Sequence, residues 1–172
     1  MVEVRRARAE DVEGIAQVCI EGCWDTYAGI RSRENIERNN RIFYNHERIT
    51  SELQEEDGWD GYIVAVDNEE VVGAIGGGMI SEKESEVYVL YLDPGRRREG
   101  IGSKLLEFLT GIHLEKGAKR QWVSVQKGNQ KGLPFYEAKG FQYQSERPAY
   151  SNVEGENYLS FRMSREIGKG DA

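Results

Sequence analysis

A glycine- and arginine-rich turn, Arg97-Arg98-Glu99-Gly100-Ile101-Gly102, lies between an apolar strand-like run and a helical pattern. The first turn of a helix exposes four backbone N–H groups and the positive end of the helix dipole, and glycines let a ligand approach them closely. This placement favours binding of a diphosphate. Taken alone, such a turn is more often a solvated helix cap, and its spacing matches neither a P-loop nor a dinucleotide-binding G-x-G-x-x-G turn.

The chain before this turn changes from helical to strand-like periodicity. A strand-like run at residues 2–7 precedes a helix that Glu10 and Asp11 open and that runs to about Gly22. Residues 33–56 have the pattern of one or two amphipathic helices. Three strand-like runs separated by polar turns then predict an antiparallel meander, at residues 62–66, 71–79 and 86–92.

The chain after the turn predicts a parallel strand pair. A helical pattern from Ile101 ends at Lys116-Gly117, and a strand-like run follows at residues 121–126. Because a crossover helix joins parallel strands, this run should lie parallel to residues 86–92. A short helix follows at residues 134–138, and two more strands at 141–146 and 157–162. Together these elements predict an α+β domain with a mixed, mostly antiparallel sheet of six to seven strands and about four helices.

Length and charge limit the function classes. The 172 residues are typical of a single domain, 1–172, with a core at about 2–163. A formal charge of -7 disfavours nucleic acid and anionic membranes as partners. Cys19 and Cys23 are expected to share a helix face as small buried side chains. With no apolar run of signal-peptide or membrane-span length, we expect a soluble, cytoplasmic protein that is a monomer or homodimer.

Two motifs together resemble the GNAT superfamily of acetyl-CoA-dependent N-acetyltransferases. The family hallmark [Q/R]-x-x-G-x-[G/A] is matched by the turn at residues 97–102, and a second signature is matched by Asn129, Phe135-Tyr136 and Gly140-Phe141. The resemblance covers about residues 2–163, with 32–56 the least diagnostic part. It implies a GNAT-like sheet whose parallel pair splays apart at the cofactor site.

The resemblance also implies how acetyl-CoA binds. Its pantetheine arm would enter the splayed gap and pair with backbone groups of Leu90, Tyr91 and Leu92, and the Leu90 N–H would bond the thioester oxygen. Asn129 would bond the same arm, although an Asn beside a glycine is also a plain turn residue. The diphosphate would rest on the turn and the serine after it: Arg97, Arg98, Glu99, Gly100, Ile101, Gly102 and Ser103.

The implied reaction is direct attack of a primary amine on the thioester in a ternary complex. A lysine-type amine has a pKa near 10.4, so a base must remove its proton. The candidate base is Glu86, which stands eleven residues before Arg97 and which could also be an ordinary exposed residue at a strand start. Tyr136, which would also contact the cofactor, is the candidate acid for the departing thiolate; its other interpretation is packing against Phe135.

The acceptor amine is the least constrained part of the prediction. The acidic chain favours a cationic acceptor such as a polyamine, another small amine, or a peptide or protein amine. His46 and His113 are expected at the surface, and no spacing of ligand residues predicts a metal. The alternative function is a non-catalytic acyl-CoA-binding or regulatory module. The residues expected around the acceptor are Trp24, Asp25, Tyr27, Arg31, Tyr150 and Asn152.

Overall fold

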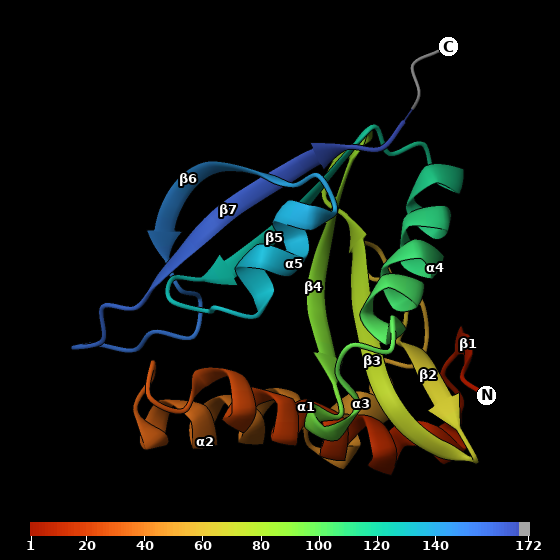
Figure 1. Ribbon diagram of the computed structural model, residues 1–172, viewed down its shortest axis with the longest axis horizontal. Helices are drawn as coiled ribbons and strands as arrows, with labels where there is room; N and C mark the ends of the chain where they lie inside the picture. Colours follow the sequence, from red (N-terminus) through yellow and green to blue (C-terminus); the bar gives the residue numbers. More distant parts are fainter. Residues whose placement is uncertain (169–172) are drawn as a thin grey trace.

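A seven-stranded mixed sheet forms the centre of the computed structural model, which describes residues 1–168 (Figure 1). The strand order is β1-β2-β3-β4-β5-β7-β6, and only β4 and β5 are parallel. This confirms the predicted α+β class and the predicted parallel pair. Residues 169–172 of the expected domain lie outside the described residues. The strands are β1 (Glu3–Arg6), β2 (Ile63–Asp67), β3 (Glu70–Met79), β4 (Glu84–Leu92), β5 (Arg120–Gln126), β6 (Gln142–Pro148) and β7 (Leu159–Glu166).

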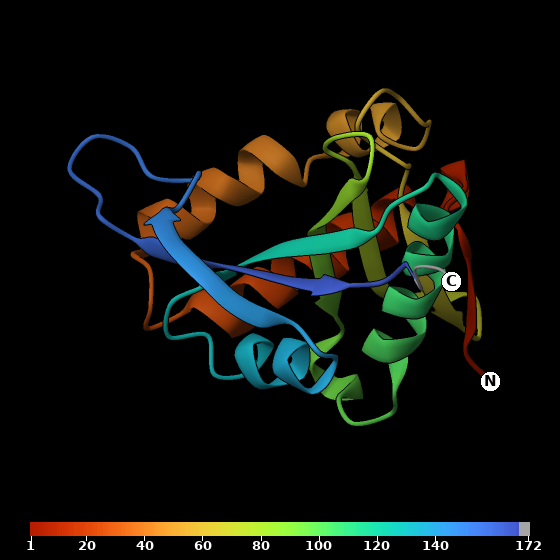
Figure 2. The same cartoon turned by 90° about the horizontal axis from the view of Figure 1, so that it is seen from above.

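Helices cover both faces of the sheet (Figures 1 and 2). One buried cluster joins α1, α2 and α3 to one face, and a second joins α4 and α5 to the other. Ser32 and Asn45 cap α2 and α3 by accepting hydrogen bonds from backbone N–H groups. No helix in residues 1–168 is long and apolar enough to cross a bilayer. The helices are α1 (Val12–Tyr27), α2 (Arg33–Phe43), α3 (His46–Ser51), α4 (Ile101–Glu115) and α5 (Gly132–Ala138).

Two helices are longer than the sequence predicts. Helix α1 continues past Gly22 to Tyr27, because Gly22 is a packing position and not a helix end. A Cβ at Gly22 would lie 2.9 Å from the Tyr91 Cβ, so glycine lets α1 approach β4 closely. Helix α5 starts at Gly132, and Pro134 falls in its first turn, where the missing N–H costs no hydrogen bond.

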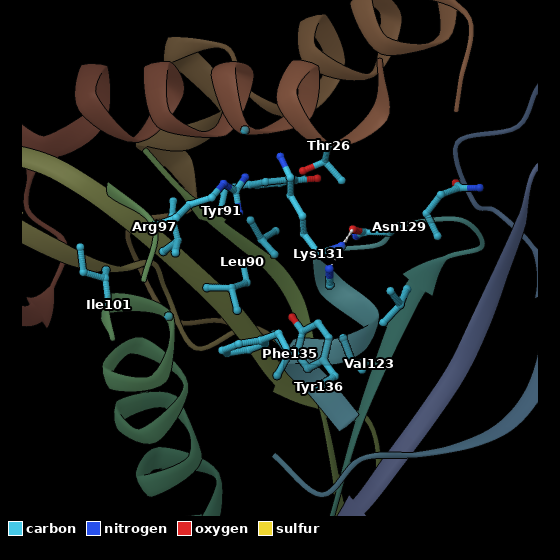
Figure 3. Close-up of a pocket in the computed structure, with 18 of the residues that line it drawn as sticks. Thr26, Leu90, Tyr91, Arg97, Ile101, Val123, Asn129, Lys131, Phe135 and Tyr136 are labelled. Carbon is cyan, nitrogen blue, oxygen red and sulfur yellow. Dashed lines mark hydrogen bonds between the residues drawn. The ribbon is translucent and has the colours of Figure 1, made fainter. Parts of the chain in front are cut away.

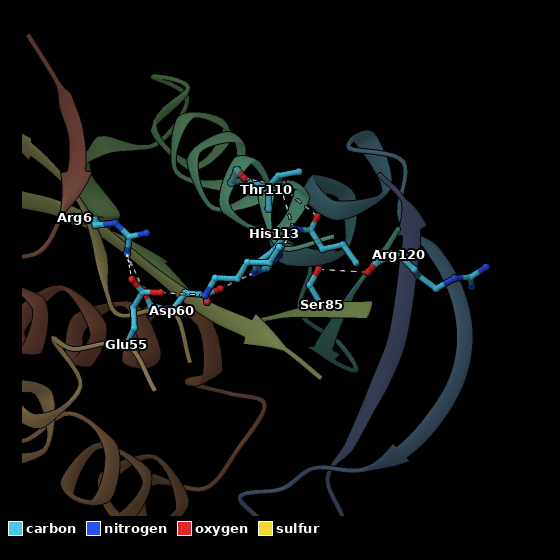
Figure 4. A network of polar contacts seen from close by, with 10 residues as sticks. Arg6, Glu55, Asp60, Ser85, Thr110, His113 and Arg120 are labelled. Atoms are coloured by element: carbon cyan, nitrogen blue, oxygen red, sulfur yellow. Dashed lines mark hydrogen bonds and ion pairs between the residues drawn. The ribbon is translucent and has the colours of Figure 1, made fainter. Parts of the chain in front are cut away.

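The prediction that His113 lies at the surface is wrong. His113 is fully buried on α4; its Nδ1 lies 3.2 Å from Gln121 Nε2 and its Nε2 lies 3.2 Å from Asp60 Oδ2 (Figure 4). Lys116 also binds the buried Asp60 carboxylate. The polar ring is accommodated in the interior because each of its nitrogens has a polar neighbour. Cys19 and Cys23, as predicted, are buried free thiols.

Candidate active site

The parallel strands β4 and β5 separate part-way along their length. Their pairing runs from Glu84–Arg120 to Val87–Val123 and ends there. We call the end of this pairing, just after Val87 on β4 and Val123 on β5, the fork. From the fork a cleft of about 630 Å³ opens between β4 and β5, bounded by α1, α5 and the turn after β4 (Figure 3). Beyond the fork, the β4 backbone from Leu90 to Leu92 pairs with β3 but not with β5.

A β-bulge explains why β4 turns away from β5 at the fork. The register between β3 and β4 shifts between Gly76 and Gly77, which leaves Tyr88 as the extra residue. A Cβ at Gly77 would lie 2.2 Å from the Glu86 carbonyl oxygen, so only glycine allows this approach. A bulge bends the strand that contains it, so β4 bends away from β5 at Tyr88. Tyr88 itself lines the cleft.

The turn after β4 presents backbone N–H groups to the mouth of the cleft. Gly100 is the N-cap of α4 and has φ 78°, which is readily adopted by glycine. Arg98 also has a positive φ, 67°, a strained conformation that often marks a functional turn. The Glu99 side chain turns back to Arg96, at 2.9 Å, and Arg96 also binds Asp67. Glu99 therefore has only its backbone left for a ligand.

A carboxylate joins two cations across the mouth of the cleft. Asp25, at the end of α1, binds Arg97 from the turn and Lys131 Nζ, the latter at 2.7 Å. The hydrogen bond from Lys131 and that from Arg97 hold the pKa of Asp25 below its usual value. Asp25, expected near the acceptor, therefore lies at the end of the cleft where the turn is. Lys131 was missed because a single lysine in a loop carries no pattern.

Tyr136 lies on α5 at the base of the cleft. Tyr136 is 8% exposed, and its ring packs edge-on against Phe135 and Phe141. Its hydroxyl oxygen points toward Leu90 (Figure 3). Burial raises the pKa of Tyr136, so the phenol stays protonated at physiological pH. The ring packs against Phe135, as one interpretation expects, and Tyr136 also lines the cleft, so the role as an acid stays a prediction. Asn129 Oδ1 accepts hydrogen bonds from the N–H groups of Lys131 and Gly132, so its Nδ2 remains for a ligand.

Glu86 is buried beside the fork and not exposed at a strand start. It is 8% exposed, and its Oε2 accepts a hydrogen bond from Arg162 Nη1 at 2.7 Å. The Arg162 guanidinium also lies over the Trp122 ring, 4.8 Å from its centroid, and donates to Ser124 Oγ at 3.0 Å. Ser124 and Val87 line the cleft, and Glu86, the residue before Val87, is not among the lining residues. Sequence spacing could not find Arg162, which is 76 residues from Glu86.

The other residues expected around the acceptor do not form one group. Tyr27 lines the cleft, and the Arg31 guanidinium stacks on its ring at 4.2 Å and donates to Gln126. Tyr150 is 69% exposed and packs against Phe43. Trp24 borders a separate shallow hollow that it shares with Arg31. Asn152 bonds both backbone groups of Tyr158 and closes the loop between β6 and β7.

The forked mixed sheet, with a glycine-containing turn at the mouth of the cleft and Tyr136 at its base, is the arrangement that the resemblance to N-acetyltransferases predicts. The family model described as the Acetyltransferase (GNAT) family matches residues 24–141. The chain belongs to this family. The predicted family, fold and enzyme class, an N-acetyltransferase, are thereby confirmed.

Two relatives and one solved structure match between 81% and 99% of this chain. A spermidine N(1)-acetyltransferase from Thermoplasma acidophilum is 32% identical over 142 residues, which are 81% of this chain and 88% of that protein. An uncharacterized N-acetyltransferase, YuaI of Bacillus subtilis, is 33% identical and covers 99% of this chain and 92% of its own length. The crystal structure of the PaiA N-acetyltransferase from Thermoplasma acidophilum in complex with coenzyme A has a TM-score of 0.81 at 27% identity, and covers 97% of this chain and 99% of its own.

Proposed function

We propose that this protein transfers the acetyl group of acetyl-CoA to a primary amine of a polyamine. The observation that carries the proposal is the fork, whose cleft has a glycine-containing turn and two cations at one end and Tyr136 at the other. The similarity to a spermidine acetyltransferase supports the acceptor class. The similarity to an enzyme solved with coenzyme A supports the donor.

The cleft offers, along its length, groups that the donor would need. The β4 backbone from Leu90 to Leu92, which pairs with β3 but not with β5, has a free side along one wall of the cleft, as an added strand would require. The backbone of the turn and the cations Arg97 and Lys131 offer charge for a diphosphate. Asn129 Nδ2 is placed to bond an amide of the pantetheine arm.

The reaction needs a proton acceptor and a proton donor at the fork. The acceptor arrives as an ammonium and loses two protons in all. The first goes to the base, and the neutral nitrogen then bonds to the acetyl carbon as the bond from that carbon to sulfur breaks. The sulfur takes a proton from the acid, and the second proton of the nitrogen restores that acid through solvent. Glu86 is the base that takes the first proton, through one bridging water because it is not among the residues that line the cleft. Its Oε1 bonds to no residue of 1–168. Tyr136 gives its proton to the sulfur as negative charge develops there.

Aromatic faces near the fork suit a cationic acceptor. The exposed ring of Tyr88 lines the cleft and stacks on Trp59 with centroids 6.3 Å apart. Such rings attract ammonium groups through their π faces. The chain's formal charge of -7 adds a general attraction for polycations.

The test is acetylation of spermidine, followed by thiol release and by mass spectrometry of the product. Spermine, putrescine, free lysine and a peptide with a free N-terminus form the comparison set. We expect the polyamines to give the highest kcat/KM. Higher kcat/KM with lysine or the peptide would overturn the acceptor class, and bound CoA with no thiol release from any amine would support the non-catalytic module instead.

A further inference from the structure

Ser124 has an unusual set of partners for a serine in a strand. It is the first residue of β5 beyond the fork and lines the cleft. Its Oγ accepts a hydrogen bond from Arg162 Nη1 at 3.0 Å, from the neighbouring strand β7, and another from Arg147 Nη2 at 3.1 Å, from β6. The same Arg162 nitrogen also donates to Glu86 on β4. Side chains from β4, β5, β6 and β7 are therefore connected through the Ser124 hydroxyl group and its partners.

The direction of these hydrogen bonds follows from the chemistry of the groups. A guanidinium can only donate, and a serine hydroxyl has two lone pairs and one proton. Both lone pairs of Ser124 are occupied, so the O–H proton is what the side chain has left to offer. Within residues 1–168 that proton is donated to no protein group. Accepting two charged hydrogen bonds also strengthens the hydroxyl as a donor.

A free donor at the fork selects the ligand atom that it can bind. An ammonium has no lone pair, and a neutral amine must keep its lone pair for the attack, so a polyamine offers Ser124 no useful acceptor. The donor substrate brings a carbonyl oxygen to the fork. We propose that the Ser124 hydroxyl donates a hydrogen bond to the thioester carbonyl oxygen of acetyl-CoA and stabilises the negative charge that develops on it. This inference rests on the proposed function.

The surrounding charges support this role. Arg162 is balanced by Glu86, whereas Arg147 has no carboxylate partner within residues 1–168. The three charged groups bonded around Ser124, which are Arg147, Arg162 and Glu86, therefore sum to one positive charge, which favours an oxyanion. Stacking on Trp122 and the ion pair with Glu86 fix Arg162, so the hydroxyl is held in place before the ligand binds. Arg147 and Arg162 are positioning residues for Ser124.

The first test is kinetic. Ser124→Ala should lower kcat by roughly 10²–10³-fold, the usual effect of removing one oxyanion donor, with CoA affinity unchanged. Ser124→Thr, which keeps the hydroxyl, should retain most of the activity. The control is Ser160→Ala, on the adjacent strand, where Ser160 pairs with Gln126. A raised KM for the amine with unchanged kcat would show that the hydroxyl serves the acceptor, and would overturn the inference.

The second test needs no turnover. The carbonyl stretch of acetyl-CoA labelled with ¹³C at the thioester carbon is measured by infrared difference spectroscopy on the bound complex without amine. The stretch should lie lower in the wild type and in Ser160→Ala than in Ser124→Ala, because a hydrogen bond weakens the C=O bond. Identical stretches in wild type and Ser124→Ala would overturn the inference. This result is independent of the acceptor, so failure of spermidine acetylation would not be confused with it.

Discussion

Tyr136 combines a packed ring with a hydroxyl that reaches the cleft, so the two contributions can be separated by one substitution. Tyr136→Phe keeps the contacts with Phe135 and Phe141 and removes only the proton donor. We expect kcat to fall by roughly 10²–10⁴-fold with an unchanged KM for acetyl-CoA. Steady-state kinetics with spermidine measures both. Full turnover in the Phe variant would remove Tyr136 from the chemistry.

Glu86 and Glu84 project from the same face of β4 and provide a matched comparison. Glu86 binds Arg162 next to the fork. Glu84 is two residues earlier on β4, farther from the fork, and accepts a hydrogen bond from Trp122 Nε1 at 3.0 Å. Glu86→Gln should lower kcat/KM most at neutral pH and recover at alkaline pH, where more of the amine is already neutral. Glu84→Gln should leave the pH profile unchanged. Equal profiles for wild type and Glu86→Gln would exclude Glu86 as the base.

At the scale of elements, α1 and the turn after β4 meet through Asp25. This carboxylate binds Arg97 and Lys131, the two cations of the proposed diphosphate site. We expect Asp25→Asn to lower the KM for acetyl-CoA several-fold, because it removes a negative charge that competes with the ligand for both cations. Calorimetric titration with CoA measures the affinity directly, and added salt should reduce the difference.

The control for Asp25 is Glu21→Gln, one helical turn earlier on α1, where the side chain is exposed and accepts a hydrogen bond from Gln17. It removes the same charge from the same helix without touching the turn. A weaker affinity for CoA in Asp25→Asn would mean that Asp25 orders the two cations for the ligand instead of competing with it.

The order and type of the elements follow from local patterns, but the partners in the site do not. Periodicity located the strands, and the spacing of two motifs located the turn and Tyr136. The Arg162–Glu86 ion pair and the Ser124 hydrogen bonds depend on β7 lying beside β5 and on the register that sets Ser124 opposite Arg162. No short-range signal encodes that register. His113 was misplaced for the same reason, because its neighbour Asp60 belongs to a loop far away in the sequence.

At the scale of the whole molecule, the buried network around Asp60 joins helix α4 to the segment before β2 and, through Gln121, to β5 (Figure 4). Lys116 extends it to the exposed Glu55. The network lies near residues 84 and 120, where the parallel pairing begins, away from the cleft. We therefore expect it to contribute to stability and not to the reaction.

Burial opposes ionisation of Asp60, but the close contact with His113 and the ion pair with Lys116 outweigh it and hold the pKa of Asp60 below its usual value. A carboxyl group whose pKa is lower in the folded state stabilises the fold above the unfolded pKa, about 3.9, and this contribution is lost as the pH falls through the folded pKa. Asp60→Asn should thus lower the free energy of unfolding by about 1.5–3 kcal/mol at pH 7, and by less at pH 3.

Urea unfolding at the two pH values measures this difference, with Asp57→Asn, at an exposed position in the same loop, as the control. The control should unfold as the wild type does at both pH values, because Asp57 forms no ion pair within residues 1–168. An Asp60→Asn deficit that is equal at pH 7 and pH 3 would mean that shape and hydrogen bonding, and not the carboxylate charge, give Asp60 its role. Unchanged kcat in Asp60→Asn below its melting temperature would confirm that the network acts on the whole fold and not on the fork.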